Sequence, residues 1–267
     1  MEQQQEHTSR TTTMIGAELR VLLVDDNKVN QFLGKRILNN LGITLIDVAG
    51  SGHEALQKIS EKPFDVLLTD VEMPGMTGYE LSKQIRSTET AESRLTIIAL
   101  TANASDEDRD NAIQAGIDDY LTKPYSPQDL LDVLKKYTIN RKHLVMEEIK
   151  PTEGNGIEKL YAVFNHNTHD VNQFLKMLHQ QLPALIHEIS NGLKQDQRDI
   201  AYNAAHKLKS PVKMLSGEIF TEEFSKFTES LRNGLPLDQA RTTFQELEKE
   251  LEGLLSMINS ELEKNGQ

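Results

Sequence analysis

Short runs of branched apolar residues alternate with amphipathic stretches from Arg20 onward. The runs VLLV, DVLL and TIIAL are too continuously apolar for strands with one solvated face, so they indicate strands covered on both faces. The segments between them repeat apolar residues at helical spacing, as covering helices do. Because strands that alternate with helices build parallel sheets, residues 19–138 are predicted to form a doubly wound, five-stranded parallel α/β domain.

The pattern changes after residue 137, where a polar segment with Pro151 predicts a linker over residues 139–156. Beyond it, residues 157–264 repeat apolar positions at helical spacing without a credible strand. We therefore expect a second, all-α domain, an antiparallel bundle of four longer helices with a short entry helix. Three glycines fall where these helices are expected to end: Gly192, Gly217 and Gly234.

Composition narrows the classes of function. The chain has no cysteine, which excludes disulfides, thiolate metal sites and a cysteine nucleophile, and the cytoplasm is the expected location. A net charge of -12 opposes binding to nucleic acid or anionic membranes, and no apolar run approaches the ~20 residues of a membrane span. Residues 1–18, rich in Gln, Glu and Thr, are expected to be a flexible leader.

Residues capable of chemistry follow the predicted strands. Asp25 and Asp26 end the first strand and Asp70 ends the third, so these carboxylates are expected to meet at one edge of a parallel sheet. Crowded carboxylates need a cation, and oxygen ligands suit Mg²⁺. Thr101 ends the fourth strand and Lys123 follows the fifth. Any one of these residues alone is better explained as a solvated strand end or a helix cap, but five coincident positions favour a site.

These residues resemble the response regulator receiver family over about residues 20–137. The chain carries four of its motifs: the Asp25-Asp26 pair, the segment DVEMPGMTG that begins at Asp70, Thr101-Ala102 and Lys123-Pro124.

The resemblance implies a flavodoxin-like fold in which Asp70 accepts a phosphoryl group and binds Mg²⁺ together with the two aspartates after the first strand. It also implies that Lys123 pairs with the phosphoryl group. Thr101 and the aromatic Tyr120 would then act as the switch that senses phosphorylation.

A histidine stands on the polar side of a predicted helix in the second domain. The apolar residues of the stretch DIAYNAAHKLKSPVKMLSG fall on one side at ~100° per residue, and His206 shares the other side with Tyr202, Lys209 and Lys213. This position disfavours a core histidine and leaves an inert surface histidine as the alternative. Neutral imidazole accepts phosphoryl groups near pH 7, and ammonium groups stabilise the dianion that it receives.

The segment AHKLKS that begins at Ala205 resembles the motif of the histidine phosphotransfer family. The resemblance implies that His206 is phosphorylated and that Lys209 supports it electrostatically. Two residues depart from the family pattern. Lys213 stands where a small residue is usual, and Pro211 removes a backbone donor and is expected to bend the helix.

Together the two resemblances imply a phosphorelay protein. A phosphohistidine on an upstream histidine kinase would give its phosphoryl group to Asp70, and His206 would exchange it with the aspartate of a downstream response regulator receiver. The sequence carries no recognisable kinase nucleotide site, so the chain is expected to transfer phosphate without using ATP.

Three alternatives stay open. The chain is equally compatible with the C-terminal part of a hybrid sensor histidine kinase, in which the chemistry is unchanged. A helical bundle that only docks partners is a second alternative, but it leaves His206 unexplained. A hydrolase of phosphorylated metabolites is the least favoured, because Asn27, which suits a helix cap, stands where a second acidic residue is needed.

Overall fold

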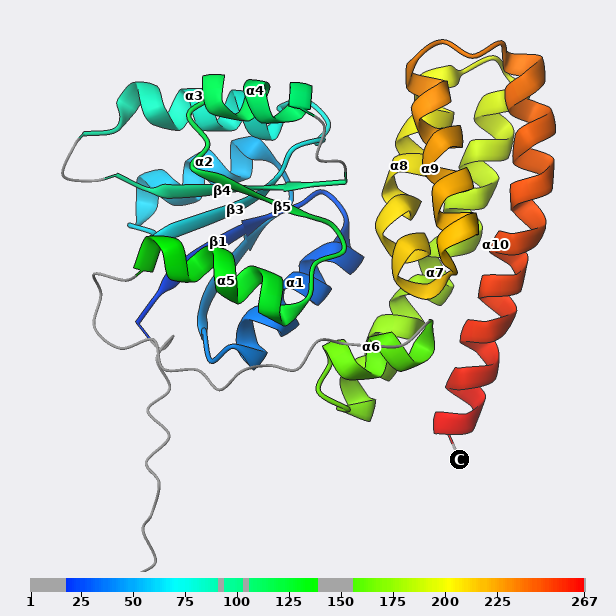
Figure 1. Cartoon of the computed structure of the whole chain (residues 1–267), viewed down its shortest axis with the longest axis horizontal. Helices are drawn as coiled ribbons and strands as arrows, with labels where there is room; N and C mark the ends of the chain where they lie inside the picture. The colour runs from blue at the N-terminus through cyan, green and yellow to red at the C-terminus, as the bar shows by residue number, and fades with distance from the viewer. Residues whose placement is uncertain (1–17, 91–93, 103–105, 139–155, 267) are drawn as a thin grey trace, which may run out of the picture.

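The computed structural model of the chain describes residues 18–90, 94–102, 106–138 and 156–266. The leader and the linker expected at residues 1–18 and 139–156 fall almost wholly outside these ranges. Figure 1 shows two parts, one built of strands layered between helices and one built of helices alone.

The first part alternates strands and helices in the predicted order. Its sheet has the strand order β2-β1-β3-β4-β5, and every neighbouring pair is parallel, which confirms the predicted five-stranded flavodoxin-like sheet. In this order the topology reverses between β1 and β3, and sheets of this kind bind ligands beyond the carboxyl ends of such strands. The elements are β1 (Arg20–Val24), α1 (Lys28–Asn40), β2 (Leu45–Ala49), α2 (Gly52–Glu61), β3 (Val66–Asp70), α3 (Gly78–Thr88), β4 (Thr96–Thr101), α4 (Asp106–Gln114), β5 (Asp119–Thr122) and α5 (Pro127–Thr138).

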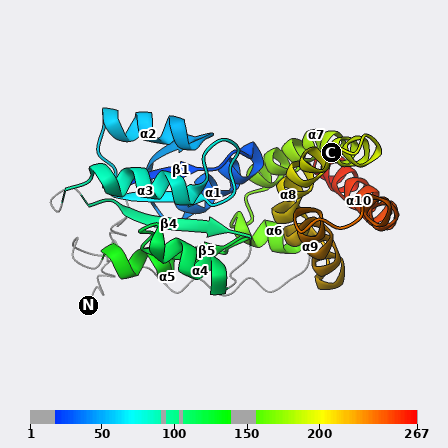
Figure 2. The same cartoon turned by 90° about the horizontal axis from the view of Figure 1, so that it is seen from above.

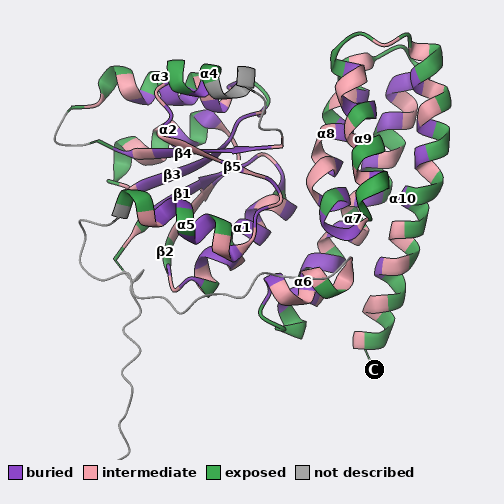
Figure 3. Cartoon of the chain, in the orientation of Figure 1, coloured by how far each residue is buried: buried purple, intermediate pink, exposed green. Residues whose placement is uncertain are grey.

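Alternate residues of each strand supply two hydrophobic cores, one on each face of the sheet. Leu22 and Leu67 belong to the core beneath α2, α3 and α4, whereas Leu23 and Leu68 belong to the core beneath α1 and α5. All four side chains are buried. Figure 1 shows these helix layers on the two sides of the sheet, and Figure 3 shows the central strands as buried.

Local sequence fixes where the helices beside the carboxyl edge begin. Asn27 caps α1, as predicted, because its Oδ1 accepts a hydrogen bond of 3.0 Å from the first turn. A capping box starts α3, with Thr77 and Glu80 each accepting from the other's backbone N–H. A Cβ on Gly78 would collide with the backbone oxygen of Asp70, so glycine lets α3 begin directly against the strand end.

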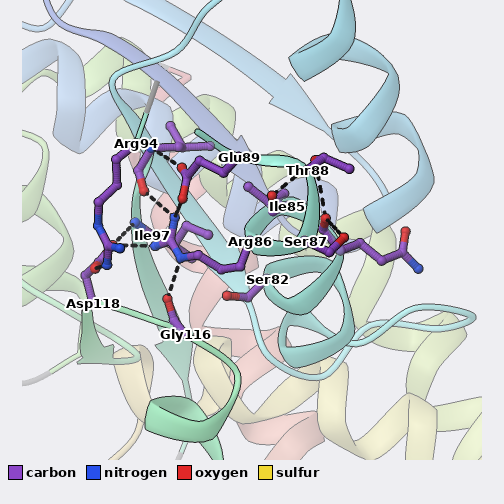
Figure 4. Close-up of polar contacts among 12 residues, drawn as sticks. Ser82, Ile85, Arg86, Ser87, Thr88, Glu89, Arg94, Ile97, Gly116 and Asp118 are labelled. Atoms are coloured by element: carbon purple, nitrogen blue, oxygen red, sulfur yellow. Dashed lines mark hydrogen bonds and ion pairs between the residues drawn. The ribbon is translucent and has the colours of Figure 1, made fainter. Parts of the chain in front are cut away.

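Arg86 ties α3 to the amino-terminal edge of the sheet (Figure 4). Its Nε donates to the carbonyl oxygen of Gly116 at 2.8 Å, and its Nη1 donates to that of Leu95 at 2.8 Å. Its Nη2 pairs with Asp118 Oδ2 at 2.6 Å, and the same carboxylate accepts from the backbone of Ile97. The guanidinium therefore joins a helix, the start of β4 and the turn before β5 through one side chain.

The second part is a C-terminal helical region in which successive long helices run in opposite directions (Figure 1). They pack around a core of leucine and phenylalanine side chains that includes Phe174, Phe224 and Phe244. Among the helices that the structure describes, none is both long and apolar enough to cross a membrane. The elements are α6 (Ile157–Val163), α7 (Thr168–Lys194), α8 (Arg198–Leu215), α9 (Glu218–Arg232) and α10 (Leu237–Asn265).

The prediction that three glycines in this region mark helix ends was wrong for one of them. Gly217 caps α9 and Gly234 lies between α9 and α10, as predicted, but α7 continues through Gly192 to Lys194. A Cβ on Gly192 would lie only 2.8 Å from the backbone nitrogen of Ala201. This glycine therefore lets α8 approach α7 closely, and it does not stop the helix.

The two parts share one hydrophobic cluster, in which α1 packs against α7 and against Phe164, which directly follows α6. The rings of Phe32 and Phe164 lie 6.1 Å apart across this joint. Beside them, Arg36 Nη2 pairs with Asp170 Oδ1 at 3.0 Å. Apolar and charged groups of both parts therefore meet here, and α1 is one of the elements against which the helical region packs.

Replacing Arg86 with alanine is expected to lower the free energy of unfolding by about 3 kcal/mol, because three segments lose a mostly buried, charged donor. Arg94→Ala is the matched control. Arg94 also pairs with Asp118, at 2.6 Å, but its side chain is 61% exposed, so a loss below about 1 kcal/mol is expected. Urea titration of both variants measures the difference, and equal losses would contradict it.

Candidate functional site

Three carboxylates meet at the carboxyl edge of the sheet, as predicted. Asp25 and Asp26 directly follow β1, and Asp70 is the last residue of β3. One oxygen of each lies within 4.8 Å of the others, and Asp25 and Asp70 are buried. This all-oxygen set fits a hard divalent cation such as Mg²⁺.

Lys123 lies between two of these carboxylates. Its Nζ is 2.6 Å from Asp25 Oδ2 and 2.7 Å from Asp70 Oδ2, and the side chain is buried. Burial lowers the pKa of Lys123, but the two carboxylates outweigh burial and raise the pKa above its ordinary value. The lysine therefore remains a cation at the centre of the site.

The folded chain accommodates the negative charge of Asp70 poorly. Burial raises the pKa of Asp70 to about 7, with Asp25 and Asp26 adding to the rise and Lys123 opposing it. A further cation beside this carboxyl group would stabilise its ionised form and lower its pKa.

The two predicted switch residues lie on the neighbouring strands. Thr101 ends β4 at the same edge and is buried, and its backbone oxygen accepts a hydrogen bond of 2.7 Å from the backbone of Lys123. Tyr120 on β5 is half-buried against the core beneath α2, α3 and α4. The sequence therefore located both side chains, and their role as a switch remains a prediction.

His206 on α8 faces the acidic edge of the sheet. A cavity of about 10 Å³, close to the volume that one water needs, is lined by both Asp70 and His206, together with Lys123 and Ser210. Figures 1 and 2 show α8 beside the first part of the chain. The two predicted phosphoacceptors thus share one cavity, although they are far apart in the sequence.

His206 is not a solvated surface histidine, because only 15% of its side chain is exposed. Burial lowers the pKa of His206, and Lys123 and Lys209 lower it further against the opposing effect of Glu72. The imidazole is therefore neutral at neutral pH, which leaves one ring nitrogen with a free electron pair.

Lys207 of α8 lines this cavity, and two further lysines of the helix, Lys209 and Lys213, make contacts of their own. Lys209 Nζ lies 3.9 Å from Glu229 Oε1, and Lys213 Nζ donates to the backbone oxygen of Lys123 at 3.2 Å. The helix continues through Pro211 to its end at residue 215. Lys213, one of the two departures from the family motif, therefore contacts the receiver-like part directly.

The sequence did not predict the contacts that join α8 to the acidic edge. Lys207 Nζ pairs with Asp26 Oδ2 at 3.2 Å, and its backbone oxygen accepts from Asn27 Nδ2 at 3.1 Å. Glu72 reaches across to His206, Tyr202 and Arg232. Local signals mark each of these residues only as polar, since their pairing depends on how the two parts dock.

Comparisons with known proteins identify the family that the α/β part of the chain resembles. Residues 21–135 match the family model of the response regulator receiver domain. The chain is 41% identical over 121 residues to the sensor protein GacS of Pseudomonas syringae pv. syringae, covering 45% of this chain and 13% of that protein. It is 33% identical over 188 residues to the sensor protein EvgS of Escherichia coli O157:H7, covering 66% of this chain and 14% of that protein. The chain therefore spans a small share of the length of these relatives.

A solved structure is also similar. The receiver domain of the sensor histidine kinase PA1611 from Pseudomonas aeruginosa PAO1, which has a magnesium ion coordinated in its active site cleft, is 37% identical to this chain. The similarity has a TM-score of 0.42 and covers 45% of this chain and 98% of that one.

The raised pKa of Asp70 predicts a pH dependence of stability in metal-free buffer. Between the ordinary value of 3.8 and about 7, the folded chain holds a proton that the unfolded chain has lost, so stability falls as pH rises. The difference in unfolding free energy between wild type and Asp70→Asn should fall by up to about 1.4 kcal/mol per pH unit there. A difference that does not fall across this pH range would contradict the assignment.

Proposed function

Because residues 21–135 are a response regulator receiver domain, we propose that Asp70 accepts a phosphoryl group from a phosphohistidine and that His206 exchanges it with a receiver aspartate. In this proposal residues 19–138 form the receiver, 139–156 the linker and 157–264 a histidine phosphotransfer bundle. The single observation that carries it is the cavity lined by both Asp70 and His206.

The alignment with EvgS adds support for the helical region. It covers 66% of this chain, more than the receiver domain alone, so it includes residues outside 21–135.

Each transfer exchanges one bond to phosphorus. When Asp70 is phosphorylated, its carboxylate oxygen forms a P–O bond as the P–N bond of the donor phosphohistidine breaks. In transfer to His206, a ring nitrogen forms a P–N bond and the carboxylate of Asp70 leaves. Lys123 is placed to stabilise charge on the phosphoryl oxygens, and Lys209 adds a cation on the histidine side.

Mg²⁺ is the cofactor that the carboxylates of Asp25, Asp26 and Asp70 would hold, because three oxygens within 4.8 Å suit a hard divalent ion. When bound, it neutralises charge that develops on the phosphoryl oxygens. The three aspartates would hold it at the carboxyl ends of β1 and β3.

The partners in this proposal are an upstream histidine kinase and a downstream response regulator receiver. The chemistry is the same for a C-terminal part of a hybrid sensor histidine kinase, and the sensor-protein relatives suit that arrangement. We place the relay in the cytoplasm, because a chain without cysteine forms no disulfides and does not need an oxidising compartment. The competing proposal, a receiver whose helices only dock partners, predicts no phosphate on His206.

The first test separates these proposals by the chemistry of the bound phosphate. Wild type, Asp70→Asn and His206→Gln are incubated with Mg²⁺ and a small phosphodonor, and acid-stable and base-stable phosphate are measured separately. Base-stable phosphate should form in wild type and be lost in both variants, since acyl phosphate is labile in base. Label confined to Asp70, even after addition of a phosphorylated histidine donor, would leave a receiver with a docking bundle.

The second test addresses the cation. Mg²⁺ should raise the thermal midpoint of wild type, because it binds only the folded arrangement of carboxylates. The rise should disappear in Asp26→Asn and persist in Asp132→Asn, whose exposed carboxylate lies outside the site. An equal rise in both variants would contradict the proposal that Mg²⁺ binds at the acidic edge.

A further inference from the structure

Glu72 lies two residues beyond Asp70, and its carboxylate crosses from the receiver to the helical region. Its Oε2 is 3.2 Å from His206 Nδ1 and also accepts the hydroxyl hydrogen of Tyr202. Its Oε1 is 3.1 Å from Arg232 Nη1. Both oxygens of one receiver side chain are therefore held by the helical region, and the relay chemistry described above does not use them.

The partners of Glu72 are a pre-arranged set of donors. Tyr202 and His206 are one helical turn apart on α8, with ring centroids 6.0 Å apart in an edge-to-face arrangement. Burial raises the pKa of Tyr202, and the hydrogen bond to Glu72 raises it further, so the phenol keeps the hydrogen that it donates. Arg232, at the end of α9, donates to the other oxygen.

The contact fixes where the ring hydrogen of His206 must be. An ionised carboxylate can only accept hydrogen bonds, so a hydrogen bond between Glu72 Oε2 and Nδ1 requires the hydrogen on Nδ1. In a neutral imidazole the free electron pair is then on Nε2. His206 also lines the cavity that contains Asp70, which is where that electron pair is needed.

We propose that Glu72 is a positioning residue for His206, which it supplies from the receiver domain across the interface, and that it makes Nε2 the nitrogen that exchanges the phosphoryl group. This inference rests on the proposed relay function. The positioning exists only while the two parts are docked, because no residue of the helical region makes this contact to Nδ1 within the described residues.

The transfer step balances with this tautomer. The electron pair of Nε2 forms the bond to phosphorus, the bond between phosphorus and the Asp70 oxygen breaks, and its electron pair stays on the carboxylate. The hydrogen on Nδ1 does not leave, so the phosphorylated ring carries a positive charge. Glu72 lies beside that charge and stabilises it, whereas the neutral ring before transfer gains less from the same carboxylate.

The experiment measures the tautomer and the transfer separately. Nitrogen-15 NMR of the full chain, labelled at histidine and not phosphorylated, reports which ring nitrogen of His206 carries hydrogen at neutral pH. Wild type should carry it on Nδ1, and Glu72→Ala should shift the population towards hydrogen on Nε2. Transfer from Asp70 to His206 should slow by roughly 10- to 100-fold in Glu72→Ala, the range found when the partner that orients a metal-binding histidine is removed.

Arg232→Ala is the matched control. It removes the partner of the other Glu72 oxygen and weakens docking, but it leaves Oε2 beside Nδ1, so the tautomer should stay as in wild type. Hydrogen on Nε2 in wild type, no change in Glu72→Ala, or an equal change in Arg232→Ala would each overturn the positioning role. If the position of the ring hydrogen depends on Glu72 but His206 never carries phosphate, the proposed function is overturned and the positioning role is not.

Discussion

The structure is organised by the crowding of three carboxylates where the sheet topology reverses. Buried charges are costly unless paired, and Lys123 pairs with Asp25 and Asp70 at once, which fastens the end of β5 to the ends of β1 and β3. One ammonium group does not neutralise three carboxylates. The remaining negative charge makes this edge attractive to further cations, and Lys207 of α8 is one that it has attracted, at 3.2 Å from Asp26.

In the proposed relay the same charge serves two purposes, as a site for phosphate chemistry and as a surface on which the helical region docks. The apolar part of the joint, at Phe32 and Phe164, does not line the cavity shared by Asp70 and His206. Around the cavity the contacts are polar, from Asn27 to Lys207 and from Lys213 to Lys123. Polar contacts at the reactive groups leave these groups hydrogen-bonded without sealing them behind hydrophobic side chains.

The sequence was sufficient for the sheet and for the acidic edge, because continuous apolar runs mark buried strands and the reactive residues directly follow them. It also predicted the cap at Asn27 and the polar face of α8 that carries His206. It failed at Gly192, since a glycine that ends a helix and one that admits a neighbouring helix look the same locally. It also missed the partners of Glu72, because Arg232 is 160 residues away and the contact depends on docking.

The cavity shared by Asp70 and His206 has a kinetic consequence. Two parts of one chain meet at an effective concentration on the order of millimolar, far above that of most separate signalling proteins. An outside protein can reach Asp70 only after α8 has moved away, since α8 residues line the cavity around it. The frequency with which this interface opens thus sets the upper limit on how fast any second protein can engage the acidic edge, however tightly it binds.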